Sequence, residues 1–229
     1  PIANKEENGS FVYGDYENDA ACVFDPTNAH AEVSAYYHVS KIYDLITAPE
    51  VGVFDLLPGR HFAGGEPVPL TVVVNYREPV AAEQASLPPT DVAFFLSHEY
   101  LAMGMSVFQG LPDIPGDVLA FGQGETTDFA ESGQTIYHEF GHALTNATAA
   151  LGTVFADSQG LTNQPSALNE GIANTLGFLG SDVPLQGAFL SDCSGYNYEF
   201  DAEGDSVFPD DATGHPVVDG NPVFSGNYD

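Results

Sequence analysis

The sequence predicts an α+β protein, because strand-like and helical segments occupy different parts of the chain. Three short segments rich in β-branched and aromatic residues lie between residues 70 and 121, separated by stretches rich in Pro and Gly. Helical patterns flank them, one upstream and two downstream. Such segregation is typical of an α+β fold. We therefore expect an N-terminal α+β lobe over residues 1–127 and a mainly helical lobe over residues 128–229 with long acidic C-terminal loops.

The first half of the chain contains one expected helix and three expected strands. Residues 1–29 are polar and predict an irregular lead-in. From His30 to Thr47 apolar residues return at helical spacing, which predicts an amphipathic helix. The strands are expected at residues 70–76, 91–96 and 117–121, because each is a short, largely apolar run next to turn-forming residues.

The second half contains two expected helices, at about residues 132–150 and at residues 166–179. Ser166 follows a proline and is predicted to be the N-cap of the second helix, and Gly180 its C-terminal stop. The remaining tail is rich in Gly, Asp, Asn and Pro without periodicity, so we expect long surface loops there.

The composition is strongly acidic, with 33 Asp and Glu against 4 Lys and Arg and a net charge of −29. Hydrophobic residues make up 43%, which is enough to bury a core and excludes an acidic disordered tail. So few basic residues exclude nucleic acids and anionic membrane surfaces as partners. No apolar run is long enough to cross a bilayer, so we expect no membrane insertion. The acidity favours an extracellular and saline setting.

The two cysteines, Cys22 and Cys193, lie far apart in the sequence. They either form one long-range disulfide, which is typical of an exported protein, or remain two buried thiols.

The chemistry-bearing motif is His138-Glu139-Phe140-Gly141-His142, within a helical stretch. Residues at i and i+4 lie on one face of a helix, so both imidazoles can bind one metal ion. Glu139 would then lie beside the metal, where its carboxylate can take a proton from a metal-activated water. The alternative is two hydrogen-bonded histidines with no metal.

A catalytic zinc ion needs a third protein ligand, and Asn169-Glu170 in the next expected helix offers a carboxylate. With this pair the chain resembles the thermolysin-like (gluzincin) secreted zinc metallopeptidases of the thermolysin and fungalysin type. The resemblance covers about residues 30–180 and includes the Tyr-Tyr-His-x-x-x-x-Tyr-Asp pattern at residues 36–44. It also includes the Gly-rich turn at residues 121–124, which follows an edge strand in that family.

The resemblance implies a zincin-like fold with the metal site between its lobes. It assigns zinc to His138, His142 and Glu170, and assigns the general base to Glu139. Asn169 would orient a ligand imidazole. His215 would be a second catalytic group that stabilises the oxyanion, although a simple loop histidine is the alternative.

Calcium is a further expected cofactor, because thermolysin-like enzymes commonly carry it and an acidic loop offers hard oxygen ligands. A solvated acidic loop is the alternative. The loop residues are Asp201, Glu203, Asp205, Asp210 and Asp211.

The chain also departs from the family pattern. Asn174 stands where the family has an aspartate that accepts a hydrogen bond from a ligand histidine. Phe155 stands in the region of an oxyanion-stabilising tyrosine, and a phenyl ring has no donor. Fewer residues follow Glu170 than in the family, so the chain is either a compact variant or part of a longer polypeptide or assembly.

These observations predict a secreted zinc endopeptidase that acts on protein or peptide substrates. A different class of function stays open: a catalytically weak or inactive subunit of an extracellular surface layer or filament, in which zinc stabilises the fold. A calcium-dependent adhesive module is the third possibility.

Overall fold

The computed structural model describes the helices and strands that surround the motif and leaves other segments aside. The described residues are 30–49, 51, 70–77, 90–98, 116–125, 127–149, 151, 155–157, 160–162, 164–183, 185–187, 193, 200–201, 217–218 and 221–222.

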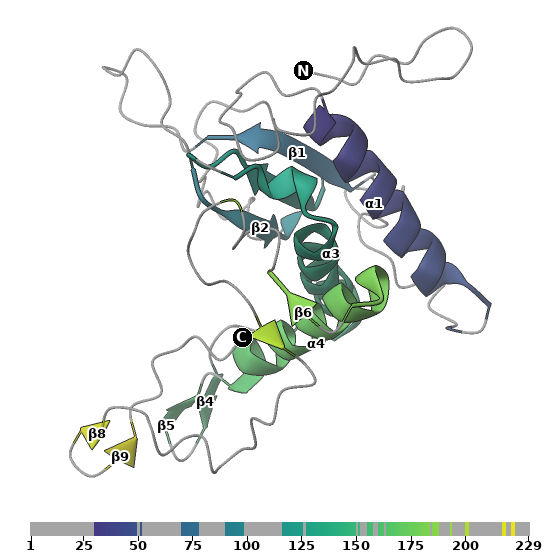
Figure 1. The fold of residues 1–229 in the computed structure, drawn as a ribbon. Helices are drawn as coiled ribbons and strands as arrows, with labels where there is room; N and C mark the ends of the chain where they lie inside the picture. Colours follow the sequence, from purple (N-terminus) through teal and green to yellow (C-terminus); the bar gives the residue numbers. More distant parts are fainter. Residues whose placement is uncertain are drawn as a thin grey trace, which may run out of the picture.

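Helices and strands are both present, which confirms the predicted α+β class (Figure 1). The larger elements are α1 (His30–Thr47), β1 (Thr71–Tyr76), β2 (Ala93–Leu96), β3 (Val118–Gly122), the 3₁₀ helix η2 (Phe129–Glu131), α3 (Gly133–Thr148) and α4 (Gln164–Ser181). The short strands are β4 (Phe155–Asp157), β5 (Gly160–Thr162), β6 (Leu185–Gln186), β7 (Phe200–Asp201), β8 (Val217–Val218) and β9 (Asn221–Pro222). They pair as β4 with β5, β6 with β7 and β8 with β9, so the described part of the tail contains short strand pairs.

The main sheet has the order β1-β3-β2, with β1 parallel and β2 antiparallel to β3. Every residue of β3 is buried, as expected for a continuous apolar run in a central strand. The resemblance predicted an edge strand before the Gly-rich turn, and this prediction is wrong. β3 pairs on both sides, and the edges of the described three-stranded sheet are β1 and β2.

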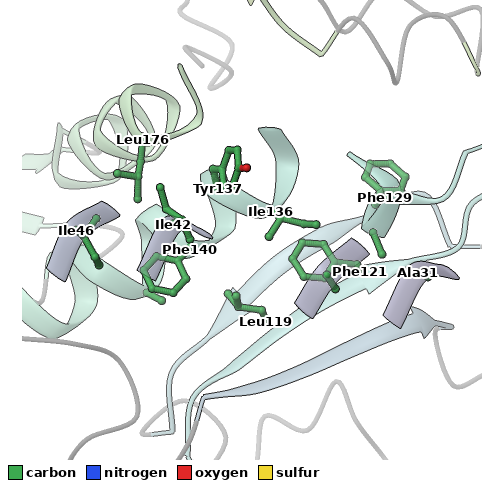
Figure 2. Close-up of a cluster of buried hydrophobic side chains, with 13 residues drawn as sticks. Ala31, Ile42, Ile46, Leu119, Phe121, Phe129, Ile136, Tyr137, Phe140 and Leu176 are labelled. Carbon is green, nitrogen blue, oxygen red and sulfur yellow. The ribbon is translucent and has the colours of Figure 1, made fainter. Parts of the chain in front are cut away.

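One hydrophobic core joins the sheet to the helices (Figure 2). Its buried side chains come from α1, β3, η2, α3 and α4; the largest include Ile42, Phe121, Ile136, Tyr137 and Phe140. Burying each side chain of this size contributes about 1.5–3 kcal/mol. The core contains residues from both sides of the boundary expected between residues 127 and 128. The division into two lobes stays a prediction.

Helix α3 begins where the sequence predicts. Ser132 is its N-cap, and the Ser132 side chain accepts a hydrogen bond from the backbone N–H of Thr135 at 3.2 Å. This contact satisfies one of the first-turn donors that have no partner within a helix.

Both predicted ends of α4 are wrong. The helix begins at Gln164, so Ser166 lies inside the first turn, where Pro165 is tolerated because first-turn N–H groups lack intrahelical acceptors. The helix continues through Gly180 to Ser181. Asp182, with φ 58°, adopts the left-handed conformation that ends it, and its N–H donates to the Phe178 carbonyl at 2.9 Å.

Gly180 has a packing role instead. A Cβ atom at this position would lie 2.5 Å from Cδ2 of Tyr137 on α3, so only glycine admits the tyrosine ring here.

Helices α3 and α4 pack most closely at Gly141, inside the motif. A Cβ atom on Gly141 would lie 2.6 Å from Cα of Ala173 and 3.2 Å from its Cβ. Backbone atoms cannot move away as a flexible side chain can, so the glycine is required for this approach. In Figure 1, α3 lies between α1 and α4.

The substitution Gly141→Ala should therefore force α3 and α4 apart. We expect the free energy of unfolding to fall by about 1–3 kcal/mol, as in other overpacked cores. Gly171→Ala is the matched control, because nothing lies within 4 Å of a Cβ atom at Gly171 on the exposed face of α4. That variant should be unchanged or up to about 1 kcal/mol more stable. Urea unfolding of both variants tests this, and equal effects would contradict the packing argument.

Candidate metal centre

Helix α3 places His138 and His142 one turn apart on the same face. Their Nε2 atoms are 3.1 Å apart, and the two rings lie nearly perpendicular, at 87°. The i, i+4 spacing of the motif therefore produces the convergence of imidazole nitrogens that it predicts.

Helix α4 contributes the third group, Glu170. Its Oε2 atom lies 3.3 Å from Nε2 of His138 and 3.4 Å from Nε2 of His142. Four ligands at 2.0–2.1 Å from one ion in a tetrahedron lie about 3.3 Å from each other. The three protein atoms thus match three corners of a tetrahedral site. Among the described residues, this is the group of His, Cys, Asp and Glu side chains that could hold a metal ion.

The outer nitrogen of His138 is held by Asn174. Nδ1 of His138 lies 2.7 Å from Oδ1 of Asn174, one turn beyond Glu170 on α4. Because an amide oxygen can only accept, Nδ1 carries the proton and Nε2 keeps the lone pair that a metal needs. Asn174 thus occupies the position that the resemblance predicts for a residue that orients a ligand.

The outer nitrogen of His142 is held less firmly. A hydrogen bond from His142 to Asn169 contributes to raising the pKa of His142, so the two side chains are neighbours. However, Nδ1 of His142 and Oδ1 of Asn169 are both buried, and neither reaches full hydrogen-bond geometry with any described residue. Asn169 is therefore a weaker contact for His142 than Asn174 is for His138.

The ligand groups strongly perturb one another. Burial alone would lower the pKa of His142, but the hydrogen bond to Glu170 and the charges of Glu139 and Glu170 raise it to about 9. Burial alone would raise the pKa of Glu170, but hydrogen bonds from His138 and His142 lower it to about 2. Without a metal, the centre therefore favours a charged carboxylate and a protonated His142.

Glu139 lies beside these ligands and is buried, with 6% of its surface exposed. Burial raises its pKa, and the charges of His138 and His142 act in the opposite direction. A hydrogen bond from the backbone of Phe95, in strand β2, also lowers the pKa. Sequence reasoning missed the Phe95 contact, because a backbone group carries no signal in the identity of its side chain.

Behind the centre, Tyr137 joins three helices. Its hydroxyl lies 2.6 Å from Nδ1 of His38, and Nζ of Lys41 lies 5.4 Å from its ring centroid. Lys41 also donates to the Gly180 carbonyl at 2.9 Å. His38 therefore contacts α3 at the residue next to His138.

Several other residues to which the sequence assigned a role lie outside the described residues or have side chains outside the description. His215, Cys22, Glu203, Asp205, Asp210 and Asp211 lie outside the described residues. Asp201 belongs to β7 and Phe155 to β4, without a described side-chain environment. The roles of His215 and of calcium therefore stay predictions. Cys193 is disulfide-bonded, and the sequence contains one other cysteine.

Comparison with known proteins adds no family to this description. No protein-family model matches the chain, and no curated protein is similar enough to count as a match. Among the described residues, no helix is both long and apolar enough to cross a membrane.

The shifted pKa values of His142 and Glu170 predict that the stability of the metal-free protein depends on pH. The pKa of His142 rises from 6.5 to about 9, so its stabilisation is complete below pH 6.5 and is lost as the pH rises through 9. The pKa of Glu170 falls from 4.5 to about 2, so its stabilisation is complete above pH 4.5 and is lost as the pH falls through 2.

Chelator-treated protein should consequently unfold at a lower urea concentration at about pH 10 than at about pH 6. The control is His142→Gln, which should lose most of this difference because the titrating imidazole is gone. Urea midpoints at both pH values measure the effect. A fall of equal size in both proteins would show that other groups cause it.

Proposed function

We propose that the protein is a zinc-dependent endopeptidase that hydrolyses internal peptide bonds of protein or peptide substrates. The observation that carries this proposal is the triangle of His138, His142 and Glu170 atoms, with the buried carboxylate of Glu139 beside it. Two imidazoles and one carboxylate are a typical ligand set for catalytic zinc, and three protein ligands leave a fourth position for water or substrate.

In the proposed reaction, three residues bind the metal ion and Glu139 transfers the proton. A bound zinc ion supplies Lewis-acid chemistry: it polarises a carbonyl and makes water more acidic. His138, His142 and Glu170 hold and orient the ion. Glu139 takes the proton from the attacking water and delivers it to the leaving amine, and a pKa raised by burial suits a group that must both accept and release a proton.

We further propose a zincin-like fold, in which a sheet lies beside the helix that bears the motif. Support comes from the hydrogen bond between the Phe95 backbone and Glu139, because Phe95 belongs to β2, one of the two edge strands of the described sheet. An edge strand beside a hydrolytic site can pair with an extended peptide.

An extracellular setting is also part of the proposal. The disulfide bond of Cys193 supports an oxidising compartment, and the net charge of −29 suits a saline medium.

Glu139→Gln should separate metal binding from catalysis. We expect zinc content to equal that of the parent, while hydrolysis of a quenched-fluorescence peptide falls by about 10²–10⁴-fold, because the amide cannot accept the proton. Glu125→Gln is a matched control, since Glu125 is exposed on the turn before η2 and its loss should leave activity unchanged. Full activity in Glu139→Gln would exclude this mechanism. A parent protein that binds zinc without any turnover would favour the structural-subunit alternative.

The net charge predicts a substrate preference. A strongly negative protein attracts cationic peptides and repels acidic ones, and salt screens both effects. We expect kcat/KM for a Lys-containing peptide to exceed that for its Glu-containing counterpart at low salt, and the ratio to shrink as salt is added. A ratio that does not depend on salt would mean that the charge has no role in selecting substrates.

A further inference from the structure

Asn174 makes a close contact behind the ligand atoms. It is buried, at 5% exposure, and its Oδ1 accepts a hydrogen bond from Nδ1 of His138 at 2.7 Å. The contact links α4 to α3 one turn beyond Glu170. It fixes both the ring orientation of His138 and the nitrogen that faces the ligand triangle.

An amide in this position provides the geometry of a carboxylate without its charge. A carboxylate would attract the Nδ1 proton and make the imidazole a more basic ligand. Asn174 orients the ring and adds no such contribution. Asn169, the neighbour of His142, is likewise a neutral amide.

The charge of the occupied centre follows from these groups. A divalent cation bound by two neutral imidazoles and one carboxylate keeps a net charge of +1, since +2 and −1 sum to +1. Neither amide reduces that charge. Asn169 and Asn174 therefore add no electrostatic attraction for the cation. That attraction comes from Glu170, from the nearby Glu139 and from the negative charge of the chain as a whole.

We propose that Asn174 is a positioning residue that holds His138 in its metal-binding tautomer while keeping the zinc affinity of the centre below the value that a carboxylate at the same position would give. Zinc in this centre then exchanges with the medium more readily. The inference rests on the metal-binding part of the proposed function and concerns occupancy of the centre rather than turnover.

The test compares zinc affinity among four proteins: the parent, Asn174→Asp, Asn174→Ala and Asn146→Asp. Affinity is measured by competition with a chromophoric chelator at fixed pH, and zinc release by transfer to excess chelator. Contacts behind metal ligands typically change affinity by about 10- to 100-fold. We expect Asn174→Asp to bind zinc tighter by about that factor and to release it more slowly, and Asn174→Ala to bind it at least about tenfold more weakly.

Asn146→Asp controls for added charge alone. Asn146 lies one turn beyond His142 on α3, so the variant adds the same carboxylate near the centre without the same contact to His138. We expect its affinity to stay near that of the parent. If Asn146→Asp strengthened binding as much as Asn174→Asp, long-range charge would explain the result and the proposal would be wrong.

A merely structural role of Asn174 predicts a different pattern. In that case Asn174→Ala would lower the urea midpoint of the metal-free protein, while the zinc affinity of the folded protein would stay unchanged. Equal affinity of the parent and a folded Asn174→Asp variant would also overturn the proposal. If Asn174→Asp does not fold, Asn174→Ala decides the question, and unchanged affinity in that variant overturns the proposal.

Failure of the proposed function is distinguishable from failure of this inference. A parent protein that binds no zinc would overturn both. A parent that binds zinc, with an affinity that does not respond to either Asn174 variant, would overturn the inference alone. Zinc binding that responds to Asn174, without peptide hydrolysis, would support the inference and remove only the hydrolytic part of the proposed function.

Discussion

The close contact between α3 and α4 is the constraint on which the rest of the centre depends. His138 and His142 share one helix, so helical geometry alone fixes their relative positions. Glu170 comes from a different helix and reaches them only because the backbone of Gly141 admits Ala173. Glu170 and Asn174 lie one turn apart on α4, so their side chains share one side of the helix, and the packing that seats Ala173 between them in the sequence brings both toward α3.

Positively charged side chains are scarce in this protein. The sequence has only four basic residues against 33 acidic ones, and Lys41 is used within the structure, at the Gly180 carbonyl near the end of α4. A cation at a helix C-terminus is favourable, because the last carbonyls carry partial negative charge. In the metal-free protein, the protonated imidazole of His142 provides positive charge beside Glu139 and Glu170. A bound metal cation would replace that positive charge.

The sequence predicts those features that depend on local periodicity. The bounds of α1 agree with the expected residues 30–47, and the three larger strands lie within two residues of their expected positions, because apolar spacing alone specifies them. The convergence of His138 and His142 was also predictable, since i, i+4 spacing fixes it, whereas Glu170 was assigned from the family resemblance. Features set by tertiary contacts were not. Gly180 looked like a helix stop but accommodates Tyr137, β3 acquired a neighbour on each side, and the Phe95 backbone contact has no sequence signature.

Tyr137 has a consequence for the rotational setting of α3. Successive residues of a helix point about 100° apart, so a contact that fixes Tyr137 also fixes the azimuth of His138. Side-chain atoms about 5–6 Å from a helix axis move by about 1 Å when the helix rolls by 10°. Such a displacement would distort the separations of 3.3–3.4 Å between these imidazoles and Glu170 on α4 beyond the tolerance of a metal site. The hydroxyl contact to His38, the Lys41 cation over the ring and the close approach of Gly180 thus resist rotation of α3 about its own axis, from a side of the helix about 100° away from His138.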